Sequence, residues 1–332
     1  MSARRQTLFW IALAAMTALL IAAGGEILAR LFSVKPYQRI NPANTTWAKP
    51  HPDLGWVNNP GVHRVHEKGH TPMTIWPDGR RATRADPAPP AAASRDLILI
   101  GCSVTEGFSV RDDQSFAWLL QAADPTLAVS NYGCPGYGTY QSLLGLERII
   151  GERKPSRPFA VVYGFLSMHA DRNVANYTFL EALRTFGGER FAPPHALMAN
   201  GSLTRYPPLV LKDWPFESRS ALVSFLHGVF LRRQLAGRDT QRIPVTLALL
   251  GEMAALVRKH GGRFVVAVLW DDPKARQYLD FLKSAGMESV DCSYRGPVND
   301  VSKLFVEING HPNRILHAWW ADCLTGWLKA SF

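Results

Sequence analysis

An uncharged apolar run near the N-terminus constrains this chain more than any other feature. Residues 8–25 hold no charged side chain and are preceded by Arg4 and Arg5. A helix of this length crosses most of the roughly 30 Å hydrocarbon core of a bilayer. Cytoplasmic flanks retain Lys and Arg, so we expect a single-pass inner (plasma) membrane protein whose bulk faces the periplasm or extracytoplasmic side. A cleaved signal peptide is the alternative, because small residues occupy positions 22–25.

The composition of the whole chain indicates a folded protein with anionic partners. Of its 332 residues 47% are hydrophobic and 19% charged, which excludes global disorder. The formal net charge of +10 favours phospholipid headgroups, acidic glycans or nucleic acid. The arginine pairs Arg80-Arg81 and Arg232-Arg233 are not interleaved with aromatic residues as in RNA-binding platforms. We therefore expect these pairs to be solvated or to face headgroups, and we expect no nucleic-acid partner.

Changes in composition divide the chain into three parts. Residues 1–32 form the cytoplasmic start and the transmembrane anchor. Residues 33–94 are rich in Pro, Gly, His and Arg, which predicts a small β-rich lead-in ending in a Pro-rich linker. Residues 95–332 alternate apolar runs with helical patterns, and this alternation predicts an α/β domain built on a doubly wound parallel sheet.

Strands and helices of this domain follow from local patterns. Strands are predicted at residues 97–100, 127–129, 159–163 and 264–269, and helices at residues 115–121, 140–150, 244–259, 273–284 and 312–328. An insertion at about residues 174–243 is predicted to hold one amphipathic stretch, 218–233, and otherwise loops that shape the site or face the membrane. Ligands bind beyond the carboxyl ends of strands in such folds, so site residues are expected directly after strands.

Three short segments carry the chemistry. The first strand runs into Gly101-Cys102-Ser103-Val104-Thr105-Glu106-Gly107, which places Ser103 where a helix should begin. It is not the G-x-S-x-G nucleophile elbow, because position 105 is Thr. The second segment is Asn131-Tyr132-Gly133-Cys134-Pro135-Gly136, and the third is His311-Pro312-Asn313 before the last predicted helix.

In this order the three segments resemble the blocks of SGNH, or GDSL-like, hydrolases, in a membrane-anchored variant with Cys before the serine. Residues 53–56 and 77–81 also resemble lead-in segments of anchored members, and the resemblance covers most of residues 50–330. It implies a flavodoxin-like sheet and a cofactor-independent serine esterase. Ser103 would be the nucleophile, His311 the general base, and Gly133 would lend a backbone N–H to the oxyanion hole.

The chemistry required of Ser103 and His311 agrees with these implied roles. A serine hydroxyl is a weak nucleophile unless a base within hydrogen-bond reach takes its proton, and imidazole titrates near neutrality. Each residue also has a structural alternative. Ser103 could be only a helix N-cap, His311 could only cap the helix after Pro312, and His169 could be a structural hydrogen-bonding residue.

The chain departs from the family pattern at two places. An acidic residue normally stands two or three positions before the histidine, but those positions are Asn309 and Ile308, with Glu307 one step farther. Either Glu307 or Asn309 is therefore expected to orient His311.

The second departure concerns the oxyanion donors. Met168 occupies the position where the third block normally offers an Asn side chain. His169, Arg172 and Asn173 are the stand-in donors, and a cationic Arg172 would favour an oxyanion or an anionic substrate group.

Histidine and cysteine patterns were weighed for metal and disulfide sites. His63, His66 and His70 lie in a predicted loop that points them to different faces, so we expect no metal. Cys102 and Cys134 follow adjacent predicted strands within disulfide reach, but we interpret them as small buried thiols. Cys292 and Cys323 could pair.

Together these patterns predict a membrane-anchored extracytoplasmic serine esterase or O-acyltransferase acting on acyl esters of a cell-envelope glycan or lipid. The alternative is a catalytically decayed binding or scaffold module of the envelope that keeps the fold.

Overall fold

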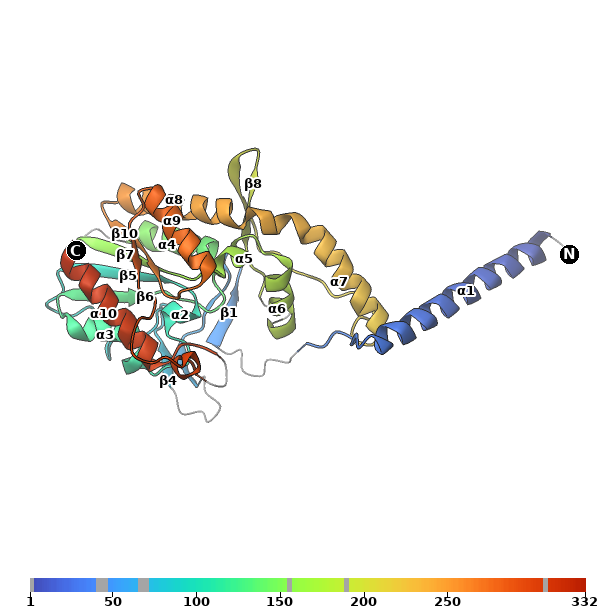
Figure 1. Ribbon diagram of the computed structural model, residues 1–332, viewed down its shortest axis with the longest axis horizontal. Coiled ribbons are helices and arrows are strands. Elements are labelled where there is room, and N and C mark those ends of the chain that lie inside the picture. Colours follow the sequence, from blue (N-terminus) through green and yellow to red (C-terminus); the bar gives the residue numbers. More distant parts are fainter. Residues whose placement is uncertain (1–2, 40–46, 65–71, 154–156, 188–190, 307–309) are drawn as a thin grey trace.

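A five-stranded parallel sheet forms the centre of the computed structural model, which describes residues 3–39, 47–64, 72–153, 157–187, 191–306 and 310–332 (Figure 1). Its strands lie in the order β11-β10-β7-β5-β6. They are β5 (Arg95–Gly101), β6 (Leu127–Asn131), β7 (Phe159–Phe165), β10 (Arg263–Val268) and β11 (Ser289–Asp291). Every pairing between them is parallel. Counted along the chain within this sheet, the order is 2-1-3-4-5, so the predicted flavodoxin-like doubly wound fold is confirmed.

Helices cover both faces of the sheet. α3 (Phe116–Ala123) and α10 (Arg314–Ser331) pack on one face, whereas α4 (Thr139–Glu152), α8 (Arg242–Lys259) and α9 (Pro273–Ser284) pack on the other. The strands are buried on both sides, which explains why they are continuous apolar runs. All five predicted helices are present within a few residues. Of the five strands described in this sheet, β11 was the one not predicted, because a three-residue edge strand has no recognisable pattern.

Two antiparallel hairpins precede the sheet. β1 (Ala48–His51) pairs with β2 (Gly55–Asn58), and β3 (Gly61–Arg64) pairs with β4 (Pro72–Ile75). The buried side chain of Trp56 donates its indole N–H to the carbonyl of Pro135 at 2.7 Å. The β1–β2 hairpin therefore packs against the loop that follows β6, next to the carboxyl ends of the strands.

The segment expected to consist mainly of loops holds more regular structure. It contains α6 (Tyr177–Gly187), the antiparallel pair β8 (His195–Ala199) and β9 (Ser202–Tyr206), and α7 (Ala221–Leu235). The predicted amphipathic stretch corresponds to α7, but the expectation of loops elsewhere was wrong. Asn200 and Gly201 both have positive φ angles, the geometry of a tight hairpin turn that Asn-Gly favours.

Short helical elements complete the architecture. They are α2 (Ser103–Glu106), α5 (His169–Asn173) and the 3₁₀ turns Asp112–Gln114, Ala236–Gln241 and Val301–Leu304.

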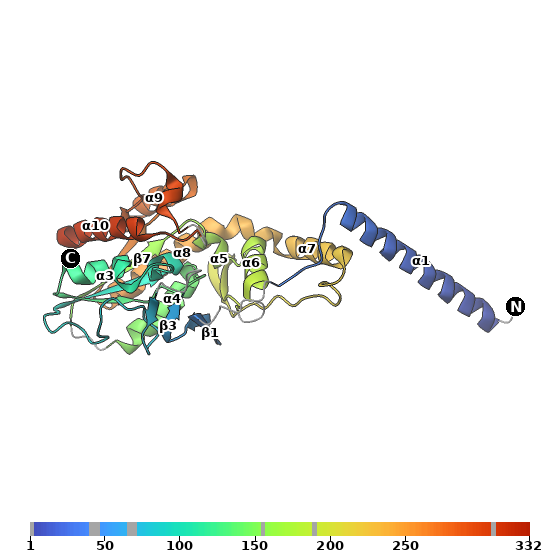
Figure 2. The ribbon, with the colours of Figure 1, turned by 90° about the horizontal axis from the view of Figure 1, so that it is seen from below.

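The N-terminal helix α1 (Ala3–Leu31) projects away from the body (Figures 1 and 2). Its most apolar window has a mean hydropathy of 2.1, and none of that window is buried. By length and composition α1 could cross a membrane or act as a signal sequence. Its C-terminal end packs against α7.

Candidate active site

Ser103 and His311, 208 residues apart in sequence, meet at the carboxyl edge of the sheet. Ser103 is the first residue of α2, directly after β5, and His311 lies just before α10. The Nε2 atom of His311 is 3.1 Å from the Oγ atom of Ser103. β5 lies between β6 and β7, so Ser103 stands where the strand order reverses, the usual ligand position in such sheets. At this distance an imidazole can accept the hydroxyl proton.

Backbone contacts hold the histidine segment in place. The N–H of Val306 donates to the carbonyl of His311 at 2.7 Å, which ties the backbone of His311 to the segment before it. Asn313 then caps α10, its side-chain oxygen accepting the N–H of Ile315 at 2.9 Å. The ring of Phe108 lies 4.9 Å from the imidazole of His311, centroid to centroid. His311 is thus held between a capped helix and an aromatic ring.

Glycines let the serine turn lie directly on the strand ends. Gly101 of β5 pairs in register with Gly164 of β7. A Cβ atom at Gly164 would stand 2.2 Å from the Oγ1 atom of Thr105, and one at Gly133 would stand 2.3 Å from the backbone nitrogen of Glu106. Both distances are far below any real contact, so α2 requires the absence of side chains beneath it.

The N–H of Gly133, predicted to stabilise the oxyanion, has a partner in this structure. It donates to the side-chain oxygen of Asn131 at 2.9 Å. The amide nitrogen of Asn131 in turn donates to the carbonyl of Thr105 at 2.8 Å. Asn131 therefore ties the Gly133 loop to α2. An oxyanion role for Gly133 stays a prediction, and it requires this N–H to be shared with or released from Asn131.

His169 does not fit its predicted role as a donor in the site. Its side chain is fully buried, and its Nδ1 atom lies 2.7 Å from the hydroxyl of Tyr163. Burial, and then the nearby charge of Arg172, hold the pKa of His169 well below its usual value. The structural alternative weighed for His169 is the one that the geometry favours.

Asn173 is also occupied within the core. Its side-chain oxygen accepts the N–H of Tyr140 at 3.1 Å, and its amide nitrogen lies 2.9 Å from the hydroxyls of both Thr139 and Thr246. With both ends of the amide satisfied and the residue 1% exposed, Asn173 positions α4 against α5 and α8. These contacts occupy both ends of the amide, so its role as an oxyanion donor stays a prediction that the geometry does not favour; the sequence does not reveal which face of α5 is buried.

Arg172 supports the loop after β6. Its guanidinium donates to the carbonyl of Tyr137 at 2.8 Å and lies 3.0 Å from the sulfur of Met168. It therefore contacts the same loop that carries Gly133, through the backbone. Glu307 and Asn309, the two candidates for orienting His311, lie outside the described residues.

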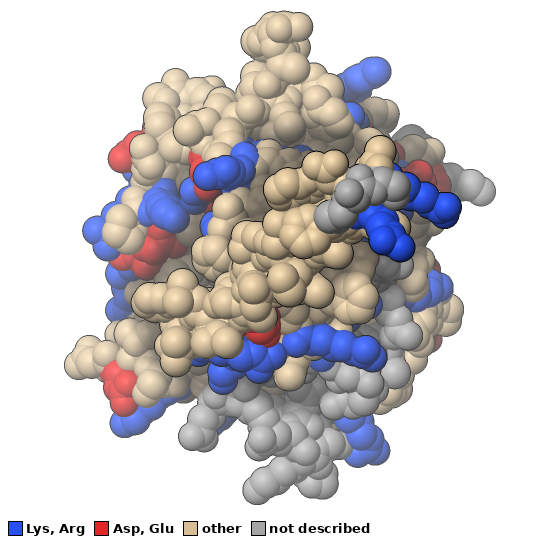
Figure 3. Space-filling view, turned by 90° about the vertical axis from the view of Figure 1, so that its right-hand side faces the viewer, with Lys and Arg blue, Asp and Glu red and all other residues tan. Residues whose placement is uncertain are grey.

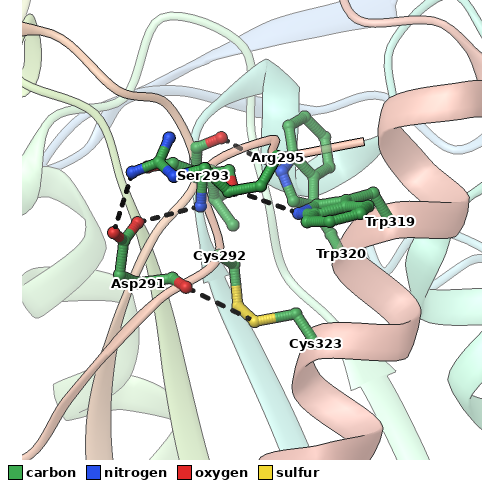
Figure 4. Close-up of a disulfide and its surroundings, with 8 residues drawn as sticks. Asp291, Cys292, Ser293, Arg295, Trp319, Trp320 and Cys323 are labelled. Carbon is green, nitrogen blue, oxygen red and sulfur yellow. Dashed lines mark hydrogen bonds and ion pairs between the residues drawn. A yellow bond between two sulfur atoms is a disulfide. The ribbon is translucent and has the colours of Figure 1, made fainter. Parts of the chain in front are cut away.

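The cysteine interpretations can be checked directly. Cys292 and Cys323 form a disulfide that joins the end of β11 to α10 (Figure 4). Cys102 and Cys134 are buried free thiols, as interpreted. Burial holds the pKa of Cys134 well above its usual value.

A buried polar cluster beneath the serine turn was not anticipated. Glu106, three residues after Ser103, is 1% exposed, and burial raises its pKa to about 8 although Arg81 acts in the opposite direction. Arg81 is fully buried and pairs with Asp112. The expectation that Arg81 is solvated was wrong, because an isolated bridge to Asn131 draws it inward next to the sheet edge.

His317 is close enough to Arg81 to be affected by its charge. It is buried, and its Nδ1 atom accepts the N–H of Phe116 at 3.3 Å. Burial, with smaller contributions from Arg81 and His311, lowers the pKa of His317 to about 3. The sequence alone does not reveal that His317 lies near Arg81 and His311. A lone histidine in an apolar helix pattern indicates only a core residue.

Two of the three histidines weighed as metal ligands, His66 and His70, lie outside the described residues. Within the described part of the chain no group of three potential ligands comes together. His63 contacts the carbonyl of Asn59 at 2.6 Å.

A cavity of about 710 Å³ lies on the lead-in side of the molecule. Its lining includes Asn58, Cys134 and Tyr137, and Asn58 donates to the carbonyl of Gly133 at 2.8 Å. Neither Ser103 nor His311 lines it. The cavity is therefore separate from the Ser103–His311 pair.

Comparisons with known proteins place the chain among distant structural neighbours. No family model matches it, and no curated protein does. Among solved structures, it is similar to a lipolytic protein of the G-D-S-L family from Veillonella parvula DSM 2008, with 11% identity, a TM-score of 0.37, and 71% of this chain and 98% of that chain covered.

Two esterase structures are similar at the same level. A psychrotrophic esterase from Pseudoalteromonas sp. shows 10% identity and a TM-score of 0.38 over 70% of this chain and 98% of its own. An acetylxylan esterase from Geobacillus stearothermophilus shows 14% identity and a TM-score of 0.37 over 70% of this chain and 94% of its own. At such identities and TM-scores, the neighbours add no argument about the function of this chain. The strand order and the geometry of Ser103 and His311 are considered on their own.

Proposed function

We propose that this protein is a serine esterase or O-acyltransferase that forms an acyl-enzyme on Ser103. The single observation that carries the proposal is the distance of 3.1 Å between the Oγ atom of Ser103 and the Nε2 atom of His311. A nucleophile and a base within hydrogen-bond reach, at the strand-order reversal of a doubly wound sheet, form the minimal arrangement for acyl transfer.

The proposed first half-reaction breaks the ester of the substrate. His311 accepts the Ser103 proton while the serine oxygen attacks the acyl carbonyl, and a tetrahedral oxyanion forms. This oxyanion lies near the start of α2, where the first backbone N–H groups of a helix lack intrahelical acceptors. His311 then returns the proton to the leaving alcohol, and the acyl group stays on Ser103.

The second half-reaction decides between hydrolase and transferase. Either water or a hydroxyl of an acceptor attacks the acyl-enzyme, with His311 again taking the proton and returning it to Ser103. Both outcomes use the same two residues. We propose acylated cell-envelope glycans or lipids as substrates.

The proposed location outside the cytoplasm has two supports. The helix α1 has the length and hydropathy of a membrane span, and Arg4 and Arg5 precede its apolar part. The Cys292–Cys323 disulfide is the second support, because structural disulfides persist in oxidising compartments such as the periplasm. We therefore propose a single-pass anchor with the α/β domain on the periplasmic or extracytoplasmic side.

The test uses the full chain purified in detergent. A fluorophosphonate probe should label the wild-type protein at Ser103, and p-nitrophenyl acetate should be turned over. Ser103→Ala should abolish labelling and lower turnover by roughly 10³-fold or more. Ser202→Ala, an exposed serine on β9, is the matched control and should behave as wild type. Turnover that survives Ser103→Ala would refute the proposal.

A binding or scaffold module is the second candidate, favoured by the pairing of the Gly133 N–H with Asn131. Loss of an oxyanion donor of this kind costs about 10²–10³ in rate, so a decayed site would retain the pair without useful catalysis. In that case the probe should label neither wild type nor Ser103→Ala, and both should bind an acylated glycan equally.

A further inference from the structure

We propose that α7 and the loop before it form a second membrane-contact surface, which rests in the headgroup region of the bilayer beside α1. This inference rests on the proposed membrane anchoring. It concerns residues that take no part in the Ser103–His311 pair, and it assigns a lipid surface as their partner.

Large apolar side chains are exposed mainly in one part of the body. Beyond α1 and the adjoining Phe32, nine described large hydrophobic residues are exposed, and six of them lie between positions 210 and 230. The six are Val210, Trp214, Phe216, Phe225, Leu226 and Phe230. Phe216 is 71% exposed, and its φ angle of 65° lies in the left-handed region typical of a turn. A concentrated apolar patch of this kind marks a protein or membrane contact.

The apolar residues of α7 fall on one face. Leu226 and Phe230 are four residues apart, about one helical turn, and Phe225 is adjacent to Leu226, so the three side chains share the exposed side of α7. The opposite side of α7 is also well packed, with His227 and Leu231 buried against the body. α7 therefore has one side buried against the body and an apolar side left exposed, as a helix lying between a protein and a bilayer needs.

The start of α7 is joined directly to the C-terminal part of α1. The carboxylate of Glu26 in α1 accepts the N–H groups of Ala221 and Leu222 at 3.0 and 2.9 Å, and the hydroxyl of Ser220 at 2.7 Å. A carboxylate from one helix thus caps the N-terminus of the other. Glu26 directly follows the uncharged run 8–25, so α7 begins at the depth where the apolar part of α1 ends.

The direction of α7 suits a helix at a surface. Figures 1 and 2 show α7 leaving the end of α1 and running back toward the sheet at a steep angle to α1, not alongside it. If α1 spans the bilayer, α7 consequently lies close to the membrane plane. Interfacial helices adopt this orientation, with their apolar side toward the acyl chains.

Buried ionic contacts hold the loop before α7 against the body. Glu217 pairs with Arg184 at 2.9 Å and with His227 at 2.8 Å, and it also accepts the N–H of Trp214 at 3.1 Å. The ring of Trp214 stacks on His227 with centroids 4.7 Å apart. These contacts fix the backbone of the segment that carries the exposed apolar side chains.

Basic residues border the apolar surface. Lys212, Arg219, Arg232 and Arg233 are exposed in the same segment. The only acids between residues 210 and 235 are Asp213 and Glu217, and both are paired with arginines. Figure 3 looks at the side from which α1 projects, so α1 lies in front of the body, and Lys and Arg are seen around the neutral residues at the centre of the view. Cations around an apolar area complement anionic lipid headgroups, and a second copy bearing the same cations would be repelled.

The test reconstitutes the full chain into vesicles containing anionic phospholipid. An environment-sensitive fluorophore is placed at Leu226→Cys, and its quenching by lipids with a spin label near the headgroup is measured. The two free native cysteines are buried, which limits background labelling. Ala330→Cys is the matched control, since it is exposed on α10 at the end of the molecule opposite α1 (Figure 1).

We expect quenching at position 226 to exceed that at position 330 by about threefold or more, as for side chains that enter the headgroup region. Equal quenching at both positions would overturn the inference. Energy transfer between labels at position 226 that rises with protein density, without lipid quenching, would identify a second copy as the partner and would also overturn it.

A third label separates this inference from the anchoring on which it rests. Leu19→Cys lies within the apolar run of α1, so deep spin-labelled lipid should quench it. Quenching at position 19 without quenching at position 226 removes only the α7 surface. An absence of quenching at both positions removes the anchor and the α7 surface together.

Discussion

The disulfide between Cys292 and Cys323 closes the loop that contains His311. The two cysteines are 31 positions apart, and they join the end of β11 to the second half of α10. Around them the indole of Trp319 donates to the carbonyl of Ser293 at 3.1 Å (Figure 4). The general base of the proposed reaction is therefore held in a covalent ring as well as by hydrogen bonds.

Replacing both cysteines, in Cys292→Ser with Cys323→Ser, should lower the free energy of unfolding by about 3–4 kcal/mol, because the unfolded chain gains the entropy of an open loop. Activity should fall as well, since His311 loses part of its support. Urea unfolding followed by circular dichroism measures the first effect. Reductant should weaken the wild type toward the variant and leave the variant unchanged. An equal response of both proteins would contradict the role of this disulfide.

Gly164→Ala should distort the serine turn. The new Cβ atom would meet the Oγ1 atom of Thr105 at 2.2 Å, so α2 must move and carry Ser103 away from His311. A misplacement of about 1 Å can cost about 10²-fold in rate, and we expect a loss of kcat of that size.

The matched control for this change is Gly145→Ala in α4, where a Cβ atom meets nothing within 4 Å. It should keep full activity and raise stability by up to about 1 kcal/mol, because Ala favours the helix. Equal activities of the two variants would show that the close approach at Gly164 does not position Ser103.

Glu106 should make the wild type less stable as the pH rises through the neutral range. Its pKa is about 8 in the folded protein and near 4.5 when unfolded, so the folded state holds one more proton between these values. The free energy of unfolding then decreases with rising pH, by at most about 1.4 kcal/mol per pH unit. Glu106→Gln removes this dependence. Urea unfolding from pH 5 to 8 measures it, with the exposed Glu152→Gln as control, and parallel curves for wild type and Glu106→Gln would disprove it.

His317 should have the opposite effect on the acid side. Its pKa is about 3 in the folded protein and near 6.5 when unfolded, so only the unfolded state binds this proton between these values. Stability therefore falls as the pH decreases from about 6.5. In His317→Gln the loss between pH 6.5 and 4 should be smaller, as measured by thermal unfolding. The exposed His260→Gln should retain the wild-type loss, and an unchanged acid limb in His317→Gln would contradict the assignment.

Patterns that depend on local sequence predicted the fold well. The continuous apolar strands and the helices with clear caps were all recognised, because a strand buried on both faces must be apolar along its whole length. The Asn200-Gly201 turn carried an equally local signal for the β8–β9 hairpin, and that signal was overlooked. The three-residue β11 offered none.

The site residues also divide into those with a local sequence signal and those without one. Ser103 and His311 were identified from the order of short motifs, and their meeting depends on the sheet that those motifs flank. The fates of His169 and Asn173 depend on which side of α5 faces α4 and α8, and Arg81 is buried through a bridge to a distant strand. Such roles are decided by tertiary packing, which a motif does not encode.

The contacts of Glu26 affect how far from the membrane Ser103 can lie. The carboxylate of Glu26 belongs to α1, and the N–H groups that it binds belong to α7. The domain is therefore joined to α1 by direct contacts and not only through the linking segment. In the proposed topology α1 would therefore fix the distance between Ser103 and the membrane surface. A substrate attached to the membrane must then present its acyl group at that distance, so the length of its carrier would help to determine which substrates react.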